Sequence, residues 1–262
     1  MNIIEALLLG LLQGLTEFLP VSSSGHLVIA QHFLGVKQPG VTFEVMVHFG
    51  TLLSIIWVFK KDLTALVRGF LYEAEQKRLF LFLIIGTIPT ALMGFFLSSF
   101  FLQIFESPFL VGIMLLVSGV IVFSISGVQI KTKDIKKMTV WDAVTIGIFQ
   151  GIAIIPGITR SGSTILGALW KGLNRETAVK YSFLLALPAI AGATFLEFLE
   201  WLKTGGSSEF LITNLLATIV AFISGVFAIT VFIKLLERGK FYYLAYYCWI
   251  VGTLTVLYTI FN

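Results

Sequence analysis

The stretch QGLTEFLPVSSSGH, residues 13–26, places polar and ionisable side chains inside a segment that is otherwise apolar enough for a lipid bilayer. An ionisable residue at membrane depth costs at least about 2.5 kcal/mol on insertion scales, so Glu17 and His26 are candidate functional residues. Pro20 interrupts the helix predicted before it, and a Ser/Gly-rich turn leads into a second apolar run, LVIAQHFLG. Helix, break and returning helix are typical of a re-entrant hairpin, which is tolerated at that depth where protein buries it or where it lines a cavity.

The composition places this hairpin in a helical membrane protein. Hydrophobic residues make up 57% and charged residues 12% of the 262 positions, and the mean hydropathy is +0.97. Soluble domains carry about a quarter charged residues, so a soluble class is excluded. The first residues, NIIEALLLG, show no basic segment and no cleavage site, and we expect no cleaved signal peptide. The net charge of +4 comes from loop lysines and arginines, so we expect no nucleic-acid partner.

The second half of the chain repeats the first. Residues 3–27 align with residues 140–164 at a constant offset of 137, which indicates a duplication. The identical aligned pairs are Ala6/Ala143, Gly10/Gly147, Gln13/Gln150, Gly14/Gly151, Ser24/Ser161 and Gly25/Gly162. We therefore predict a single membrane domain, 1–262, with repeat one at 1–128, a basic linker at 129–138 and repeat two at 139–262.

Each half is predicted to hold one hairpin and three spanning helices, which makes the protein all-α and polytopic. Apolar runs predict spans near residues 43–59, 79–101, 109–128, 181–202, 210–233 and 241–260. The charged segment 60–78 is too polar for a bilayer and predicts an interfacial helix. After a re-entrant hairpin the chain is back on the side of the membrane from which it entered, whereas three spans take it to the opposite side. The second half therefore enters from the opposite face, and the repeats are inverted.

Positive charges predict the orientation of these spans. Lys37 and Lys203 fall on one side of the membrane, and Arg160 is left within it. The remaining basic residues share the other side. The positive-inside rule makes that side cytoplasmic. Those residues are Lys60, Lys61, Arg68, Lys77, Arg78, Lys131, Lys133, Lys136, Lys137, Lys171, Arg175, Lys180, Lys234, Arg238 and Lys240. Both termini and the mouth of the first hairpin then face outward, and the second hairpin enters from the cytoplasm.

The two aligned hairpins differ in their polar residues. One keeps Glu17, Ser23 and His26, and the other carries Arg160 within TRSGST. In inverted repeats the broken helices of the two halves meet near the midplane. Helix N-termini and arginine bind phosphate, and a hydroxyl beside a histidine is a candidate nucleophile with its base. A carboxylate beside Gln13 can hold a divalent cation or activate water. The set predicts phosphate-ester chemistry on a lipid phosphate.

Two motifs resemble those of the BacA/UppP family, the undecaprenyl-diphosphatases of bacteria. QGLTEFLPVSSSGH is similar to the family's E/Q-x-x-x-E and P-V-S-S-x-G-H, and PGITRSGST to its P-G-x-S-R-S-x-x-T. The likeness extends through FEVMVHFGTLLSI and AVKYSFLLALPAI and covers essentially the whole chain. It implies hydrolysis of undecaprenyl diphosphate to undecaprenyl phosphate and inorganic phosphate on the outer face of the bacterial inner membrane. It also implies recycling of the lipid carrier of cell-wall synthesis, bacitracin resistance, a Mg or Ca cofactor and a frequent homodimeric state.

The resemblance also implies roles for single positions. Glu17, Ser23, His26 and Arg160 would be catalytic, with Ser23 as the nucleophile and Arg160 on the phosphate. Glu17 and Gln13 would hold the cation. Substrate-binding roles are predicted for Gln13, Ser22, Ser24, Gly25, Thr159, Ser161, Gly162 and Thr164. The chain departs from the family pattern where Gln13 replaces a frequent Glu and Thr159 replaces a usual Ser.

Other interpretations of these residues stay open. Arg160 could form a structural salt bridge with Glu17. Ser22 and Ser24 could cap the loop rather than bind substrate. Inverted repeats with broken helices are also transporter architecture, so a transporter or flippase for an anion or a lipid phosphate is the alternative function.

Two further sequence patterns are weaker indications of function. The residues Ser24, Gly25 and His26 imitate part of the signature of acid-phosphatase-type lipid phosphatases, but that type needs a later histidine, and none follows residue 160. Glu44 and His48 form an i, i+4 pair near the start of a span, where we expect a solvated helix end.

Overall fold

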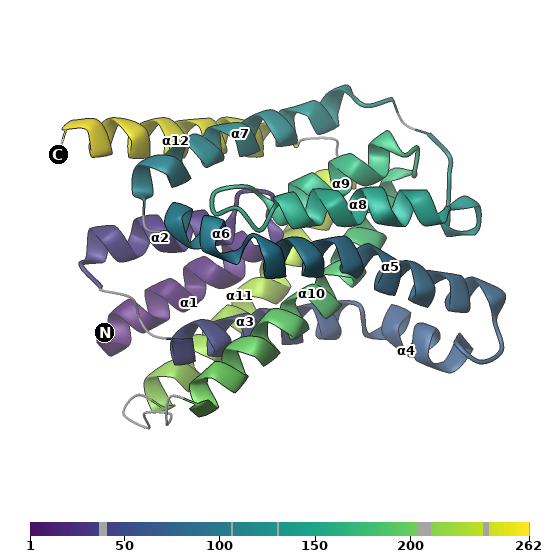
Figure 1. Ribbon diagram of the computed structural model, residues 1–262, viewed down its shortest axis with the longest axis horizontal. Helices are drawn as coiled ribbons and strands as arrows, with labels where there is room; N and C mark the ends of the chain where they lie inside the picture. Colours follow the sequence, from purple (N-terminus) through teal and green to yellow (C-terminus); the bar gives the residue numbers. More distant parts are fainter. Residues whose placement is uncertain (37–40, 106, 130, 204–210, 238–240, 262) are drawn as a thin grey trace.

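The protein is a bundle of α-helices that run roughly along one long axis (Figure 1). The computed structural model describes residues 1–36, 41–105, 107–129, 131–203, 211–237 and 241–261. Within these ranges the regular structure is helical apart from one isolated β-bridge between Lys133 and Leu173, which confirms the all-α prediction. Three of the basic residues that predict the membrane orientation, Lys37, Arg238 and Lys240, lie outside the described residues.

The first half contains the predicted hairpin and spans. Its elements are α1 (Ile3–Phe18), α2 (Ser23–Leu34), α3 (Val41–Val58), α4 (Lys60–Gly69), α5 (Ala74–Phe96), α6 (Ser98–Phe105) and α7 (Pro108–Gly127). The helix expected in the charged segment is α4, which is bent by 74° from α3. The second predicted span differs at both ends. Its helix α5 begins within the charged segment, where Arg78 donates to the Met138 carbonyl at 2.7 Å, and a break at Leu97 separates it from α6.

The second half also has a helical hairpin followed by three long helices. Its elements are the 3₁₀ turn η1 (Ile135–Lys137), α8 (Val140–Ile152), α9 (Arg160–Trp170), α10 (Arg175–Lys203), α11 (Leu211–Glu237) and α12 (Tyr242–Phe261). Among the described residues, five helices are long and apolar enough to cross a membrane, or six if α3 and α4 form one bent span. These six are α3, α5, α7, α10, α11 and α12, so the multi-pass membrane prediction is confirmed.

Both hairpins begin with a capping box, formed by Asn2 with Glu5 and by Thr139 with Asp142. Asp142 also pairs with Lys133 and, at 3.7 Å, with Lys171, so it ties the linker to the start of α8. Burial alone would raise the pKa of the Asp142 carboxyl, but the hydrogen bonds from Lys133 and Thr139 outweigh it and hold that pKa below its ordinary value.

The two halves dock by exchanging equivalent contacts. Helix α1 packs on α11 of the second half, and α8 packs on α5 of the first. A Cβ at Gly10 would lie 2.5 Å from the Ala217 carbonyl oxygen, and one at the aligned Gly147 would come closer still to the Gly86 carbonyl oxygen. Only a glycine permits this backbone contact, which is the usual reason for small residues between membrane helices. The aligned glycines therefore have the same packing role in both halves of the chain.

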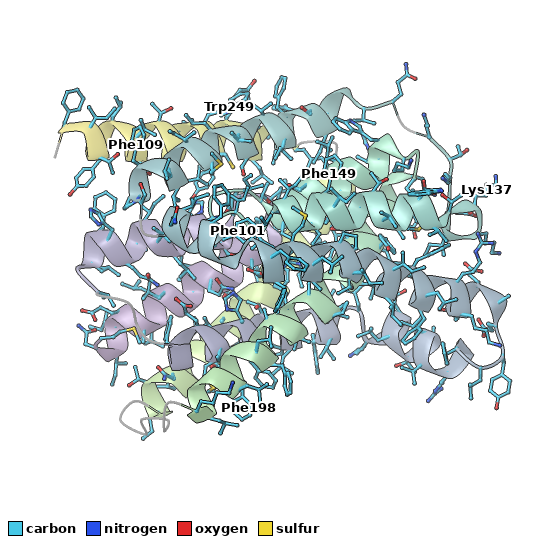
Figure 2. All side chains as sticks on the ribbon, viewed as in Figure 1. Phe101, Phe109, Lys137, Phe149, Phe198 and Trp249 are labelled. Carbon is cyan, nitrogen blue, oxygen red and sulfur yellow. The ribbon has the colours of Figure 1, made fainter. Side chains whose placement is uncertain are left out.

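The ends of the molecule differ in what they carry. Both termini lie at one end of the long axis, toward which the α1–α2 hairpin opens, and the α8–α9 hairpin opens toward the other end (Figure 1). That second end also holds α4 and Lys137 of the basic linker (Figure 2). The inverted relation of the repeats and their orientation in a membrane stay predictions.

Candidate active site

The tips of the two hairpins touch one another. A Cβ at Gly25 would lie 3.0 Å from Gly157 Cα, and one at Gly162 would lie 3.3 Å from Pro20 Cβ. These two contacts are equivalent under the duplication, since residue 25 aligns with 162 and residue 20 with 157. Gly157 has φ +93°, and a side chain there would meet the Val111 carbonyl oxygen at 2.6 Å, so this turn requires glycine.

The carboxylate of Glu17 lies where the tips meet and accepts three hydrogen bonds. Arg160, the first residue of α9, donates to Oε1. Ser23, the first residue of α2, donates to Oε2, and Gln13 donates to the same oxygen at 3.1 Å. The Glu17 side chain is 7% exposed and that of Arg160 is 18% exposed, so the pair is largely buried and the Arg160 side chain remains partly exposed. The structure thus brings together Gln13, Glu17, Ser23 and Arg160.

Gln13 has one unused polar atom. Its side chain is fully buried one turn before Glu17, and its Oε1 has no hydrogen-bond partner among the described residues. A buried acceptor left unpaired costs about 1–3 kcal/mol, so this oxygen is available to a donor or a cation. The aligned Gln150 shares the feature, with its Nε2 donating to Thr90 at 3.1 Å.

The three serines of the first hairpin have different partners. The Ser22 hydroxyl accepts from the Gly25 amide at 3.3 Å and lies 3.3 Å from the Ser24 hydroxyl. Ser23 is the one whose hydroxyl reaches Glu17. Ser22 also has φ 69°, the one positive value among the described non-glycine residues. Such strain is typical of functional sites, because the surrounding structure must hold it in place.

His26 is 6% exposed and uses both ring nitrogens. Nδ1 lies 2.7 Å from the Ser22 carbonyl oxygen, and Nε2 lies 2.8 Å from the hydroxyl of Tyr247 on α12. The two rings are stacked, with centroids 5.5 Å apart and planes inclined by 6°. Ser23 lies three residues before His26 and therefore on the same face of α2. The role of Tyr247 could not be predicted from the sequence, since a tyrosine in an apolar span carries no local sign of its partner.

The second hairpin is fixed by a serine of the first half. Ser118 on α7 donates to the Gly157 carbonyl at 2.6 Å and accepts from the Thr159 amide at 2.9 Å. Thr159 in turn caps α9 by accepting from the Gly162 amide at 3.2 Å. Ser118 therefore holds the turn that directly precedes Arg160, and this contact too was not anticipated.

The hydroxyls predicted to bind substrate from α9 are already engaged. Ser161 lies 3.4 Å from the Thr159 hydroxyl. Thr164 donates to the Arg160 carbonyl at 2.9 Å and lies 2.5 Å from the Ser182 hydroxyl. These contacts order the first turn of α9, and the substrate-binding roles stay predictions.

Glu44 and His48 do not form a solvated helix end. Both side chains are half-buried, and Nδ1 of His48 lies 2.9 Å from the Glu44 carbonyl oxygen. The expectation was wrong because α3 packs against α11, α10 and α1, which the i, i+4 spacing alone could not show.

The arrangement suits an anion with several oxygens. The first amides of α2 and α9 have no partner within their own helices. The side chains of the first residues, Ser23 and Arg160, both reach Glu17. Arg160 adds a planar cationic donor set that matches phosphate. Ser23 brings a hydroxyl whose proton already points at a carboxylate.

The family model described as bacitracin resistance protein BacA matches residues 6–254. The chain belongs to the BacA family. Among BacA relatives, an undecaprenyl-diphosphatase of Alkaliphilus metalliredigens is 42% identical over 99% of this chain and 100% of its own length. Proteins of the same name from Syntrophotalea carbinolica and Halothermothrix orenii are 43% and 41% identical, over 96% and 98% of this chain and 97% and 98% of theirs. The family resemblance expected from the two hairpin motifs is confirmed.

Proposed function

We propose that this chain is a membrane phosphatase that hydrolyses undecaprenyl diphosphate to undecaprenyl phosphate and inorganic phosphate. The substrate follows from the name that its relatives carry, and the family description links the activity to bacitracin resistance. The observation that carries the proposal is the meeting of Ser23 and Arg160 on one carboxylate, Glu17. A nucleophile, a base and a phosphate ligand then share one enclosed site.

In the bound state, Arg160 and the first amides of α2 and α9 hold the phosphate oxygens. The phosphate competes with Glu17 for the guanidinium, which frees the carboxylate to act as a base. The prenyl tail leaves the site sideways between the apolar helices. Because the Arg160 side chain is 18% exposed in its ion pair, we expect it to exchange partners without unfolding of the hairpin.

The chemical step is an in-line attack on the terminal phosphorus by Ser23 or by a water in its place. The attacking hydroxyl gives its proton to Glu17, the bond from the terminal phosphorus to the bridging oxygen breaks, and the lipid monophosphate leaves. His26, on the same face of α2 as Ser23, relays this proton from Glu17 to the oxygen of the leaving monophosphate. If Ser23 attacks, water then hydrolyses the phosphoserine and releases inorganic phosphate.

A Mg or Ca ion fits these residues. Among the described side chains, no three of the types His, Cys, Asp and Glu come together, so the protein supplies few ligands of its own. Glu17 and the unpaired Oε1 of Gln13 are the oxygens that would hold the ion, and bound phosphates commonly complete a Mg coordination shell. The ion would supply charge stabilisation at the leaving phosphate.

We also propose a membrane orientation and an oligomeric state for the enzyme. It sits in the bacterial inner membrane with both termini and the mouth of the α1–α2 hairpin on the outer face, and the basic loops in the cytoplasm. The charge distribution of the sequence supports this orientation. We also propose that it forms a homodimer, as the family resemblance implies.

The test is phosphate release from undecaprenyl diphosphate by protein purified in detergent. We expect release by the wild type and its loss in Arg160→Ala and in Glu17→Ala. Full activity in either variant would remove that residue from the mechanism. Reconstituted vesicles discriminate the transporter alternative, because movement of intact substrate without released phosphate would favour transport over hydrolysis.

A further inference from the structure

We propose that Tyr247 is a positioning residue for His26, and that it keeps Nε2 of the imidazole as the nitrogen that exchanges the proton. This inference rests on the proposed hydrolysis and adds to it a residue from the last helix of the chain. Its basis is the 2.8 Å contact between the Tyr247 hydroxyl and Nε2, which joins residues 221 positions apart.

The partners of the imidazole decide which nitrogen carries the hydrogen. Nδ1 lies 2.7 Å from the Ser22 carbonyl oxygen, and a carbonyl can only accept. Nδ1 therefore carries a hydrogen in every protonation state of His26. In the neutral ring Nε2 then has a free lone pair, and the Tyr247 hydroxyl must donate to it.

The Tyr247 hydroxyl can also bind the protonated imidazole of His26. When His26 takes up a proton, that proton can only sit on Nε2, which becomes a donor. A tyrosine hydroxyl both donates and accepts, so its hydrogen turns away and its oxygen accepts from Nε2. The same contact thus survives the gain and the loss of a proton, as a proton-relaying histidine requires.

The surrounding helices hold Tyr247 in this position. The next residue, Cys248, contacts the Pro20 carbonyl at 3.7 Å, so α12 meets the first hairpin at two neighbouring points. Helix α12 also packs on α7, where a Cβ at Gly252 would lie 2.8 Å from the Gly112 carbonyl oxygen. Trp249 of α12, labelled in Figure 2, donates to the Leu116 carbonyl of α7 at 3.1 Å. The rotation of α12 that points Tyr247 at His26 is therefore set by packing.

The decisive variant is Tyr247→Phe, which keeps the stacked ring and removes the hydroxyl. Tyr246→Phe is the matched control, because Tyr246 is the neighbouring tyrosine and its ring contacts Tyr242 and Trp249 rather than the site. With undecaprenyl diphosphate, we expect Tyr247→Phe to lower kcat by about tenfold, the size of one hydrogen bond, with KM changed by less than about twofold. Tyr246→Phe should match the wild type.

A double-mutant cycle shows whether Tyr247 acts through His26. In a His26→Gln background, adding Tyr247→Phe should lower kcat no further, because the shared function is already lost. Nitrogen NMR of labelled histidine provides a readout that does not depend on turnover. It should show the hydrogen on Nδ1 in the wild type and a changed Nε2 signal in Tyr247→Phe.

Three results would overturn the proposal: a wild-type kcat in Tyr247→Phe, an equal loss in both backgrounds, or an unchanged Nε2 signal. A wild type that releases no phosphate would instead overturn the proposed function, and this role with it. Active wild-type protein with an unaffected Tyr247→Phe removes the role of Tyr247 alone.

Discussion

Arg160 donates a hydrogen bond to a carboxylate oxygen of Glu17 across 143 positions of the chain. Both charged side chains are largely buried: Arg160 is 18% exposed and Glu17 is 7% exposed. An enclosed ion pair contributes little net stability, but removing one partner leaves the other charge uncompensated. Single and double substitutions of the pair therefore have different effects on stability, and this difference can separate its structural role from its catalytic role.

We expect Glu17→Gln and Arg160→Gln each to destabilise the protein, by about 3 kcal/mol, because each leaves one charge unpaired. The double variant should be less destabilised than the sum, since no unpaired charge remains. All three should lose about 100-fold or more in phosphate release. Thermal unfolding in detergent and the release assay check both parts. A double variant that regains activity together with stability would mean that the pair is structural only.

Ser23→Ala should abolish the attack that begins at the hydroxyl bound to Glu17, and we expect a loss of about 100-fold or more in kcat. Ser24→Ala is the matched control on the next position, because the Ser24 hydroxyl contacts Ser22 and not the carboxylate. It should retain most of the activity. Equal losses in the two variants would assign the effect to the loop rather than to the nucleophile. Trapped phosphoserine in a stopped reaction would show direct attack by Ser23.

Ser118→Ala should loosen the turn before Arg160, because it removes the partner of two buried backbone groups, the Gly157 carbonyl and the Thr159 amide. We expect a loss of about 2 kcal/mol in stability, and about tenfold in kcat through misplacement of Arg160. Ser124 on the same helix bonds to Val120 within α7, away from the site, so Ser124→Ala should change neither quantity. A stable, fully active Ser118→Ala protein would contradict this role.

The duplicated glycines give a packing prediction. Gly10→Ala and Gly147→Ala should each destabilise the fold by about 2 kcal/mol or more, since their Cβ atoms would lie 2.5 Å or less from carbonyl oxygens. At Gly192 in α10 an added Cβ would have nothing within 4 Å, so Gly192→Ala should be neutral or stabilising by about 0.5–1 kcal/mol. Unfolding temperatures in one detergent compare the three. A harmless Gly147→Ala would contradict the close contact of α8 with α5.

Removal of divalent cations tests the proposed ion. Chelation by EDTA should stop phosphate release, and added Mg or Ca should restore it. Gln13→Ala should raise the cation concentration needed for half-maximal activity by about tenfold, whereas Gln150→Ala, its buried counterpart in the other repeat, should leave that concentration unchanged. Full activity in EDTA would remove the ion from the proposal.

Much of the architecture could be predicted because lipid imposes simple rules. Apolar runs marked the spans, Pro20 and the Ser/Gly turn marked a hairpin, and the duplication pointed to two such hairpins meeting. From this, contact between Glu17 and Arg160 could be expected before any coordinates, and the structure has it. The boundaries of α5 could not be predicted, because contacts with the linker stabilise its charged first turn.

The contacts of Tyr247 and Ser118 could not be predicted for a common reason. Each depends on how far a helix is rotated about its own axis, and the helices that carry them are apolar on every side. Such a helix has no polar face that indicates its orientation. Close packing at glycines, as between Gly112 and Gly252, sets that rotation, and its effect appears only once both helices are in place.

Cys248 is the one thiol of the chain, fully buried, with its sulfur against the Pro20 carbonyl. A thiol enclosed in this way reacts with a maleimide only when α12 moves away from the first hairpin. Its rate of alkylation is therefore an intrinsic gauge of that movement and needs no engineered label. Protection by a bound diphosphate would show that ligand and thiol report on the same opening.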